Sequence, residues 1–120
     1  MKALNVKALL GTFDEHWHPR VIGRLNGQEV RIAKLLGEFD WHRHDDAEEL
    51  FYIVEGEMVL RFREREVPLR AGDLCIVPRG AEHQPYAERE CHVLLFEPEG
   101  TRNTGNLENE RTVQPIDLSE

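Results

Sequence analysis

The sequence predicts an all-β protein, an antiparallel β-barrel or β-sandwich. Three observations lead to this prediction. Apolar and polar residues alternate with period two in short runs, turn residues separate these runs, and no helical run is longer than about one turn. Nine short strands in one small chain are typical of barrels and sandwiches.

The chain length fits one such domain. The chain has 120 residues, of which 40% are hydrophobic and 32% are charged, enough for a buried core that needs no disulfide scaffold. We expect a single domain over residues 1–120, with its core at about residues 20–98.

The elements follow in chain order. Val6–Leu10 is the only helical run, and we expect at most one packed turn because it is short and Gly11 ends it. The predicted strands are Val21–Asn26, Glu29–Leu36, Phe39–Arg43, Leu50–Val54, Met58–Arg63, Glu66–Leu69, Leu74–Val77, Gln84–Ala87 and His92–Glu97.

Turn chemistry justifies the breaks between these strands. Asn26 and Gly27 form the dipeptide that a two-residue type I′ hairpin prefers, because both central residues need a positive φ. Gly56 and Gly72 mark two more reversals, and Pro78 ends a strand because it has no N–H to donate to the ladder.

The C-terminal segment Gly100–Glu120 is rich in Asn, Thr and Glu. It is either a solvated tail or an arm that lies on a partner. Its scattered Val113, Ile116 and Leu118 favour the arm.

The charge balance limits the classes of partner. The formal net charge is −8 and the chain has no Lys/Arg-rich run, which argues against nucleic acid and anionic membranes because both require basic surfaces. Small molecules and other proteins remain. We expect a cytoplasmic protein, since neither a membrane span nor a signal core is visible. Cys75 and Cys91 each lie in an apolar run, so we expect buried thiols, with a disulfide between them as the alternative.

A group of metal-ligand residue types follows Trp41. His42 and His44 are two apart in a predicted strand, so both imidazoles point to one face. A turn at Asp45 and Asp46 then brings Glu49 back beside them. Imidazoles with one carboxylate suit a first-row divalent metal better than Ca²⁺ or Mg²⁺.

A second segment runs from Gly72 through Pro78 and Gly80 to His83. The two segments together resemble the paired motifs of the cupin family. The first reads His-x-His, four residues, Glu, six residues, Gly, and the second reads Gly, five residues, Pro-x-Gly, two residues, His. The resemblance implies a double-stranded β-helix, or jelly-roll barrel, and assigns metal-ligand roles to His42, His44, Glu49 and His83.

This resemblance also implies one divalent transition metal per chain, which the ligand types narrow to iron, manganese, nickel, cobalt, zinc or copper. Glu48 is the rival carboxylate. Glu49 is preferred because the six-residue gap to Gly56 starts from it and because it shares strand parity with Phe51 and Ile53.

The chain departs from the family pattern at two positions. Gly37 is one residue nearer to the first histidine than is common, and Ala87 stands where the family often has Asn. The second departure weakens any analogy to oxalate-degrading members.

The same parity argument predicts the pocket. The residues expected to face the metal are Phe51, Ile53, Met58, Leu60 and Phe62. An apolar wall around an open metal edge fits an iron-dependent dioxygenase, in which Glu49 would also shuttle a proton.

Alternative functions remain open at this stage. A sugar-phosphate isomerase needs a cationic anchor, which only Lys34 offers. A non-catalytic metal- or ligand-binding module is the competing class. A third class is an apo interaction domain, in which the four metal-ligand residue types would occur at this spacing by coincidence.

The remaining aromatic and histidine residues are expected at the surface. His16, His18 and His92 lack a carboxylate or turn frame of the kind found at the metal motif, so we interpret them as surface or strand-end residues. Trp41 and Tyr52 face outward. Such outward-facing aromatic residues support the homodimer that the family resemblance implies.

Overall fold

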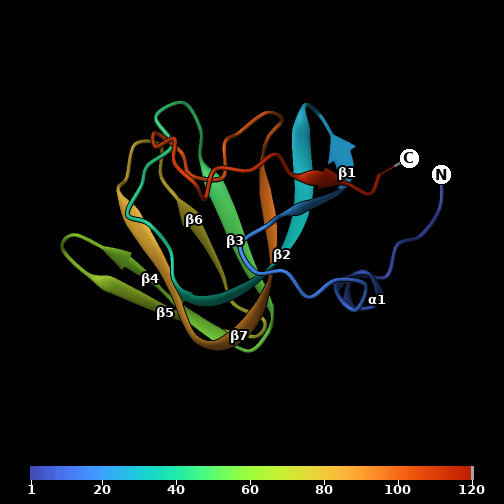
Figure 1. Ribbon diagram of the computed structural model, residues 1–120, viewed down its shortest axis with the longest axis horizontal. Coiled ribbons are helices and arrows are strands. Elements are labelled where there is room, and N and C mark those ends of the chain that lie inside the picture. The colour runs from blue at the N-terminus through green and yellow to red at the C-terminus, as the bar shows by residue number, and fades with distance from the viewer. Residues whose placement is uncertain (120) are drawn as a thin grey trace.

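The structure, a computed structural model, describes residues 1–119 and is an all-β barrel with one short helix (Figure 1). The helix is α1 (Val6–Leu10). The strands are β1 (Arg20–Leu25), β2 (Gln28–Glu38), β3 (Glu49–Glu55), β4 (Glu57–Phe62), β5 (Glu66–Arg70), β6 (Leu74–Val77), β7 (His83–Pro98) and β8 (Ile116–Asp117). The predicted fold class is confirmed.

The sheet follows the order β5-β4-β7-β2-β1-β8, and β3 pairs with both β7 and β6. All these pairings are antiparallel except that of β1 with β8, which is parallel. Strand β7 is 16 residues long. Its first residues pair with β4 and its last with β3, so β7 joins the two walls of the barrel.

Two predicted strands differ from the structure. Gln84–Ala87 and His92–Glu97 are parts of the single strand β7, which continues because both halves pair with β2. Phe39–Arg43 is not a strand. The ladder of β2 shifts register between Leu35 and Gly37, and only His42 then pairs, through an isolated bridge to His83.

The predicted turns agree with the structure better than the predicted strands do. Asn26 and Gly27 have φ values of 51° and 77°, and they join Leu25 to Gln28 in the expected two-residue hairpin. Helix α1 is the single packed turn that was expected. The side chain of Asn5 caps its N-terminus, and Leu10 is its buried residue.

The C-terminal segment lies along the barrel of its own chain, so it is not the detached solvated tail that was one of the two expectations. It crosses the barrel to reach β1 (Figure 1), where Ile116 pairs with Arg20. Along this path Thr104 is fully buried.

The core has two parts. One fills the barrel and includes Ile53, Leu60 and Val93, and the other lies outside β2, where Leu10 of α1 packs with Ile32. Cys75 and Cys91 are both free thiols. Burial raises the pKa of the Cys91 thiol to about 12, so it remains protonated at neutral pH. Within residues 1–119, no helix combines the length and hydropathy of a membrane span.

Candidate metal centre

Four side chains predicted as metal ligands meet inside the barrel. One ligand atom from each of His42, His44, Glu49 and His83 lies within 4.8 Å of the others, and all four residues are buried. His42 and His44 lie in the connection between β2 and β3, while Glu49 begins β3 and His83 begins β7. The backbones of His42 and His83 exchange two hydrogen bonds, which bring the two motifs together.

Three of the ligand atoms lack any hydrogen-bond partner in the structure. They are the buried Nε2 atoms of His44 and His83 and the Oε1 atom of Glu49. The Glu49 oxygen lies 3.4 Å from the His44 nitrogen and 3.6 Å from the His83 nitrogen. These separations exceed a good hydrogen bond but fit atoms that are each about 2.0–2.2 Å from one ion. The residues therefore fit a divalent transition metal.

Two imidazole rings are oriented by backbone carbonyl groups. Nδ1 of His42 lies 2.8 Å from the carbonyl oxygen of Asp40, and Nδ1 of His83 lies 2.9 Å from that of Ala81. A ring that donates through Nδ1 keeps the lone pair of Nε2 for a metal. Burial and then the neighbouring His83 lower the pKa of His42 to about 4, so this ring is neutral at pH 7.

The surroundings of Glu49 favour the ionised form of its carboxyl group. Burial alone opposes ionisation, but interactions with Glu97, His44 and His83 outweigh it and hold the pKa of Glu49 well below its usual range. Glu48, the rival carboxylate, is exposed, whereas only 6% of Glu49 is exposed. This geometry favours Glu49 as the ligand.

A buried ionic network that the sequence analysis missed lies behind Glu49. Arg31 contacts Glu97 at 2.8 Å and Glu29 at 2.6 Å, and all three side chains are buried. Burial, followed by the charge of Glu49, raises the pKa of Glu97 well above its usual range. The signal in the sequence was the position of Glu29 and Arg31. These two charged residues share strand parity with the apolar Ala33 and Leu35, and so lie on the inward face of β2.

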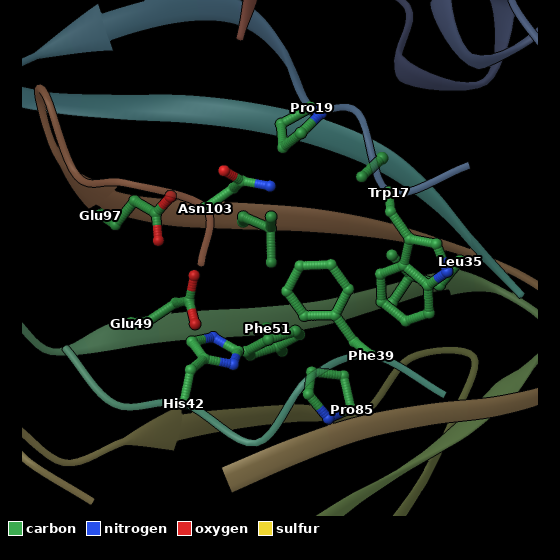
Figure 2. A pocket seen from close by; sticks show the side chains of 12 residues that line it. Trp17, Pro19, Leu35, Phe39, His42, Glu49, Phe51, Pro85, Glu97 and Asn103 are labelled. Atoms are coloured by element: carbon green, nitrogen blue, oxygen red, sulfur yellow. The ribbon is translucent and has the colours of Figure 1, made fainter. Parts of the chain in front are cut away.

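A cavity of about 40 Å³ adjoins the metal centre. Figure 2 shows His42, Glu49, Glu97 and Asn103 on one side of it. The rest of the wall is apolar and includes Trp17, Leu35, Phe39, Phe51, Pro85 and Leu95.

Only Phe51 of the five predicted pocket residues lies on the wall of this cavity. Ile53, Met58 and Leu60 do point into the barrel, but they are packed in its core, with Phe62 against them. Ile53, Met58 and Leu60 lie along β3 and β4 beyond the metal centre, and parity alone does not specify depth along the barrel. Phe62 pairs with His83, and the centroids of their rings are 6.2 Å apart.

The C-terminal segment braces His42. Gly105 has a φ of 58°, and a Cβ atom placed there would collide with the carbonyl group of Arg43 and lie 3.0 Å from the His42 ring. Only glycine fits this contact.

Gly105→Ala is therefore expected to displace the segment together with the ring of His42. We expect a loss of about 1–3 kcal/mol in the free energy of unfolding and weaker metal binding, measured by urea unfolding and metal titration. Gly100→Ala is the matched control, because Gly100 also has a positive φ but nothing lies within 4 Å of its Cβ position. Equal losses in both variants would contradict the brace.

The other histidines lie outside the site. His16 contacts Glu90 at 2.8 Å, and His92 contacts the same residue at 3.0 Å. His18 contacts the carbonyl oxygen of Gln114. Outside the barrel, Trp41 lies under the guanidinium group of Arg63.

Comparisons with known proteins agree with this geometry. The Cupin domain family matches residues 29–97. The chain is 36% identical over 84 residues to the uncharacterized protein YdbB of Bacillus subtilis, covering 69% of this chain and 74% of YdbB. It is 30% identical over 103 residues to 3-hydroxyanthranilate 3,4-dioxygenase of Xenopus laevis, covering 79% of this chain but only 36% of that enzyme.

A solved structure gives the same result. The crystal structure of a cupin-2 domain containing protein from Shewanella frigidimarina superposes with a TM-score of 0.79 and 38% identity, covering 80% of this chain and 94% of that one. Together with the four converging side chains and the jelly-roll barrel, these matches show that the chain belongs to the cupin family.

Proposed function

We propose that the protein is a metal-dependent oxidoreductase of the dioxygenase type, with one divalent transition metal held by His42, His44, Glu49 and His83. The observation that carries the proposal is the set of three buried ligand atoms without partners, which converge beside an apolar cavity. Similarity to relatives named as dioxygenases supports the reaction class.

The metal, when bound, supplies the one-electron exchange that organic molecules need in order to react with O₂. The chain supplies the rest. The apolar wall, including Phe39 and Phe51, excludes bulk water. Glu49 is the proposed catalytic residue, because its second oxygen can hold a proton while the first binds the metal.

The test begins with elemental analysis of protein purified without a metal-affinity tag, compared with the His42→Ala/His44→Ala variant. About one iron, manganese, nickel, cobalt, zinc or copper ion per chain, lost in the variant, is expected. Oxygen uptake by the iron-loaded protein, with small hydroxy compounds and 3-hydroxyanthranilate as candidate substrates, then tests the reaction class. Absence of metal even after reconstitution would contradict the proposal.

A non-catalytic module that binds a metal or a small ligand is the second candidate. The small volume of the cavity, about 40 Å³, favours it. This candidate predicts the same metal content but no oxygen uptake. Lys34 does not supply the cationic anchor that a sugar-phosphate isomerase needs. Its side chain donates a hydrogen bond to the carbonyl oxygen of Phe13 and does not line the cavity.

We also propose a homodimer that pairs through the outer face of β3 and β6. Leu74 and Ile76 are 56% and 53% exposed on β6, next to Tyr52 on β3. Among the residues that the structure describes, strand β6 pairs with β3 alone. Exposed apolar side chains on and beside an edge strand favour contact with a second copy of the chain.

Light scattering during size-exclusion chromatography is therefore expected to give about 28 kDa, twice the chain mass of 14.0 kDa. Leu74→Lys/Ile76→Lys should give the monomer, since two buried charges would disrupt the interface. Leu25→Lys, at an exposed hairpin residue, should leave the dimer intact. A wild-type mass of about 14 kDa would contradict the dimer.

A further inference from the structure

Trp17 separates the metal cavity from the surface of the protein. Its side chain lines the cavity of about 40 Å³ beside the metal centre and also an outer hollow of about 430 Å³, which residues 15–18 form with residues 110, 111 and 113. Figure 2 shows the Trp17 ring at one end of the cavity, with Glu49 and Glu97 at the other end. Among the described apolar residues of the wall, Trp17 alone is only half-buried. The thickness of one indole ring therefore lies between the cavity and the outer hollow.

The closed cavity is too small for most organic ligands. A volume of about 40 Å³ holds about three water molecules, and hence a ligand of only a few non-hydrogen atoms. A larger molecule reaches the metal centre only if part of the wall moves. Ladder hydrogen bonds fix the part of the wall that β2, β3 and β7 contribute. The part that moves therefore lies among the segments outside these strands.

Two wall residues outside the strands, Phe39 and Asn103, are held in place. The N–H of Phe39 donates to the carbonyl oxygen of Pro85 at 3.0 Å, and its carbonyl oxygen accepts from the side chain of Gln84 at 3.0 Å. The side chain of Asn103 makes two hydrogen bonds to the backbone of the C-terminal segment. Both residues are therefore fixed parts of the wall.

The ring of Trp17 is held by contacts that a rotation of its side chain would break. It stacks on Phe39 with 4.8 Å between the ring centroids, and its indole N–H donates to the carbonyl oxygen of Leu36 at 2.8 Å. The backbone of Trp17 has a φ of 60°, which is uncommon for a bulky residue. Because this conformation costs free energy, tertiary contacts and not local preference keep the ring in the wall. The outer hollow, which Trp17 also lines, offers space for the displaced ring.

We propose that Trp17 is a gate that sets the size of the molecules that reach the metal centre. In its closed position the ring admits only molecules of a few non-hydrogen atoms, and its rotation into the outer hollow admits larger ones. This inference rests on the metal site proposed above and identifies a residue that selects its ligands by size. The apparent affinity for a large ligand is reduced by the fraction of molecules whose gate is closed, whereas the affinity for a small ligand is not.

Chemical modification of the metal-free full chain tests the gate independently of metal. Diethyl pyrocarbonate acylates neutral imidazole and is too large for the closed cavity. Mass spectrometry of peptides follows the three histidines of the metal centre, with His92 outside the site as the internal reference. We expect Trp17→Ala to raise the modification rates of the three histidines, relative to His92, at least about tenfold. Wild-type rates equal to that of His92 would show that the metal centre is already open and would overturn the gate.

Three further variants separate an open gate from lost stability. Trp17→Phe keeps a ring in the wall and should react nearly as the wild type does. Trp41→Ala removes the other tryptophan, which lies under Arg63 outside the barrel, and should leave the rates unchanged. Leu10→Ala removes a buried side chain from the second core, which does not line the cavity, so it lowers stability without opening the wall. Equal increases in Leu10→Ala and Trp17→Ala would mean that the reagent enters by unfolding, and the gate would be wrong.

Cobalt(II)-loaded protein tests the selection by size. Azide fits the closed cavity and benzimidazole does not, and visible absorption of the cobalt reports the binding of each probe. We expect Trp17→Ala to gain at least about tenfold in affinity for benzimidazole and to keep its affinity for azide. Equal gains for both probes, or no gain for benzimidazole, would overturn the gate. A chain that takes up no cobalt would contradict the metal site alone, because modification of the metal-free chain still decides whether Trp17 closes the cavity.

Discussion

Replacing His44 by alanine is expected to reduce metal affinity by more than about 100-fold, since residues that merely orient metal ligands already contribute about 10–100-fold. The Nε2 atom of His44 is buried without another partner and lies 3.4 Å from the Glu49 oxygen. No other described histidine, cysteine or acidic residue belongs to the cluster and can replace it.

The thermal midpoint separates lost ligation from lost packing. A metal that binds only the folded state raises the midpoint, so metal-loaded wild-type protein should melt several °C above stripped protein. In His44→Ala this difference should disappear, whatever the variant loses in packing. A variant that keeps one metal per chain and the full difference would show that His44 is not a ligand.

A matched pair of variants tests the choice of carboxylate. Glu48→Gln and Glu49→Gln make the same chemical change at neighbouring residues, but Glu48 is exposed and Glu49 is buried among the histidines. Elemental analysis should find metal retained in the first and reduced in the second. The opposite result would assign Glu48 as the ligand.

The cupin fold and the four ligands could be predicted because their signals are local. The spacing of His42, His44 and Glu49 does not depend on where the predicted strands begin and end. The turn at Asn26 depends only on the dipeptide that Asn26 forms with Gly27. The strand predicted at Phe39–Arg43 failed for a tertiary reason. The ladder of β2 with β7 ends after Glu38, and beyond it His42 pairs only through an isolated bridge to His83.

The cavity wall could not be predicted because its residues meet only through long-range pairing. Glu29 faces Glu97 across β2 and β7, a register that neither segment encodes alone. Trp17 and Asn103 come from segments outside the strands, which period-two patterning cannot place. The candidate metal ligands therefore carry a sequence signature, whereas the other residues of the cavity wall do not.

Arg31→Met is expected to cause the largest loss of stability, about 3–5 kcal/mol in the free energy of unfolding at pH 7. The substitution keeps most of the volume but leaves Glu97 buried without its cation and Glu29 with Arg24 as its remaining cation. Arg43→Met is the control, because Arg43 pairs with Asp45 at the surface. Such pairs contribute at most about 1 kcal/mol.

The pH dependence identifies the cause of this loss. Burial and the charge of Glu49 already raise the pKa of Glu97, and without Arg31 the pKa of this carboxyl should rise further. A group whose pKa is higher in the folded state stabilises the protein below its unfolded pKa, and this stabilisation disappears as the pH rises through the folded value. The deficit of Arg31→Met, measured by urea unfolding of metal-free protein, should therefore be smaller at pH 5 than at pH 8. A deficit independent of pH would mean that Arg31 contributes packing alone, and the ionic account of this wall would then be wrong.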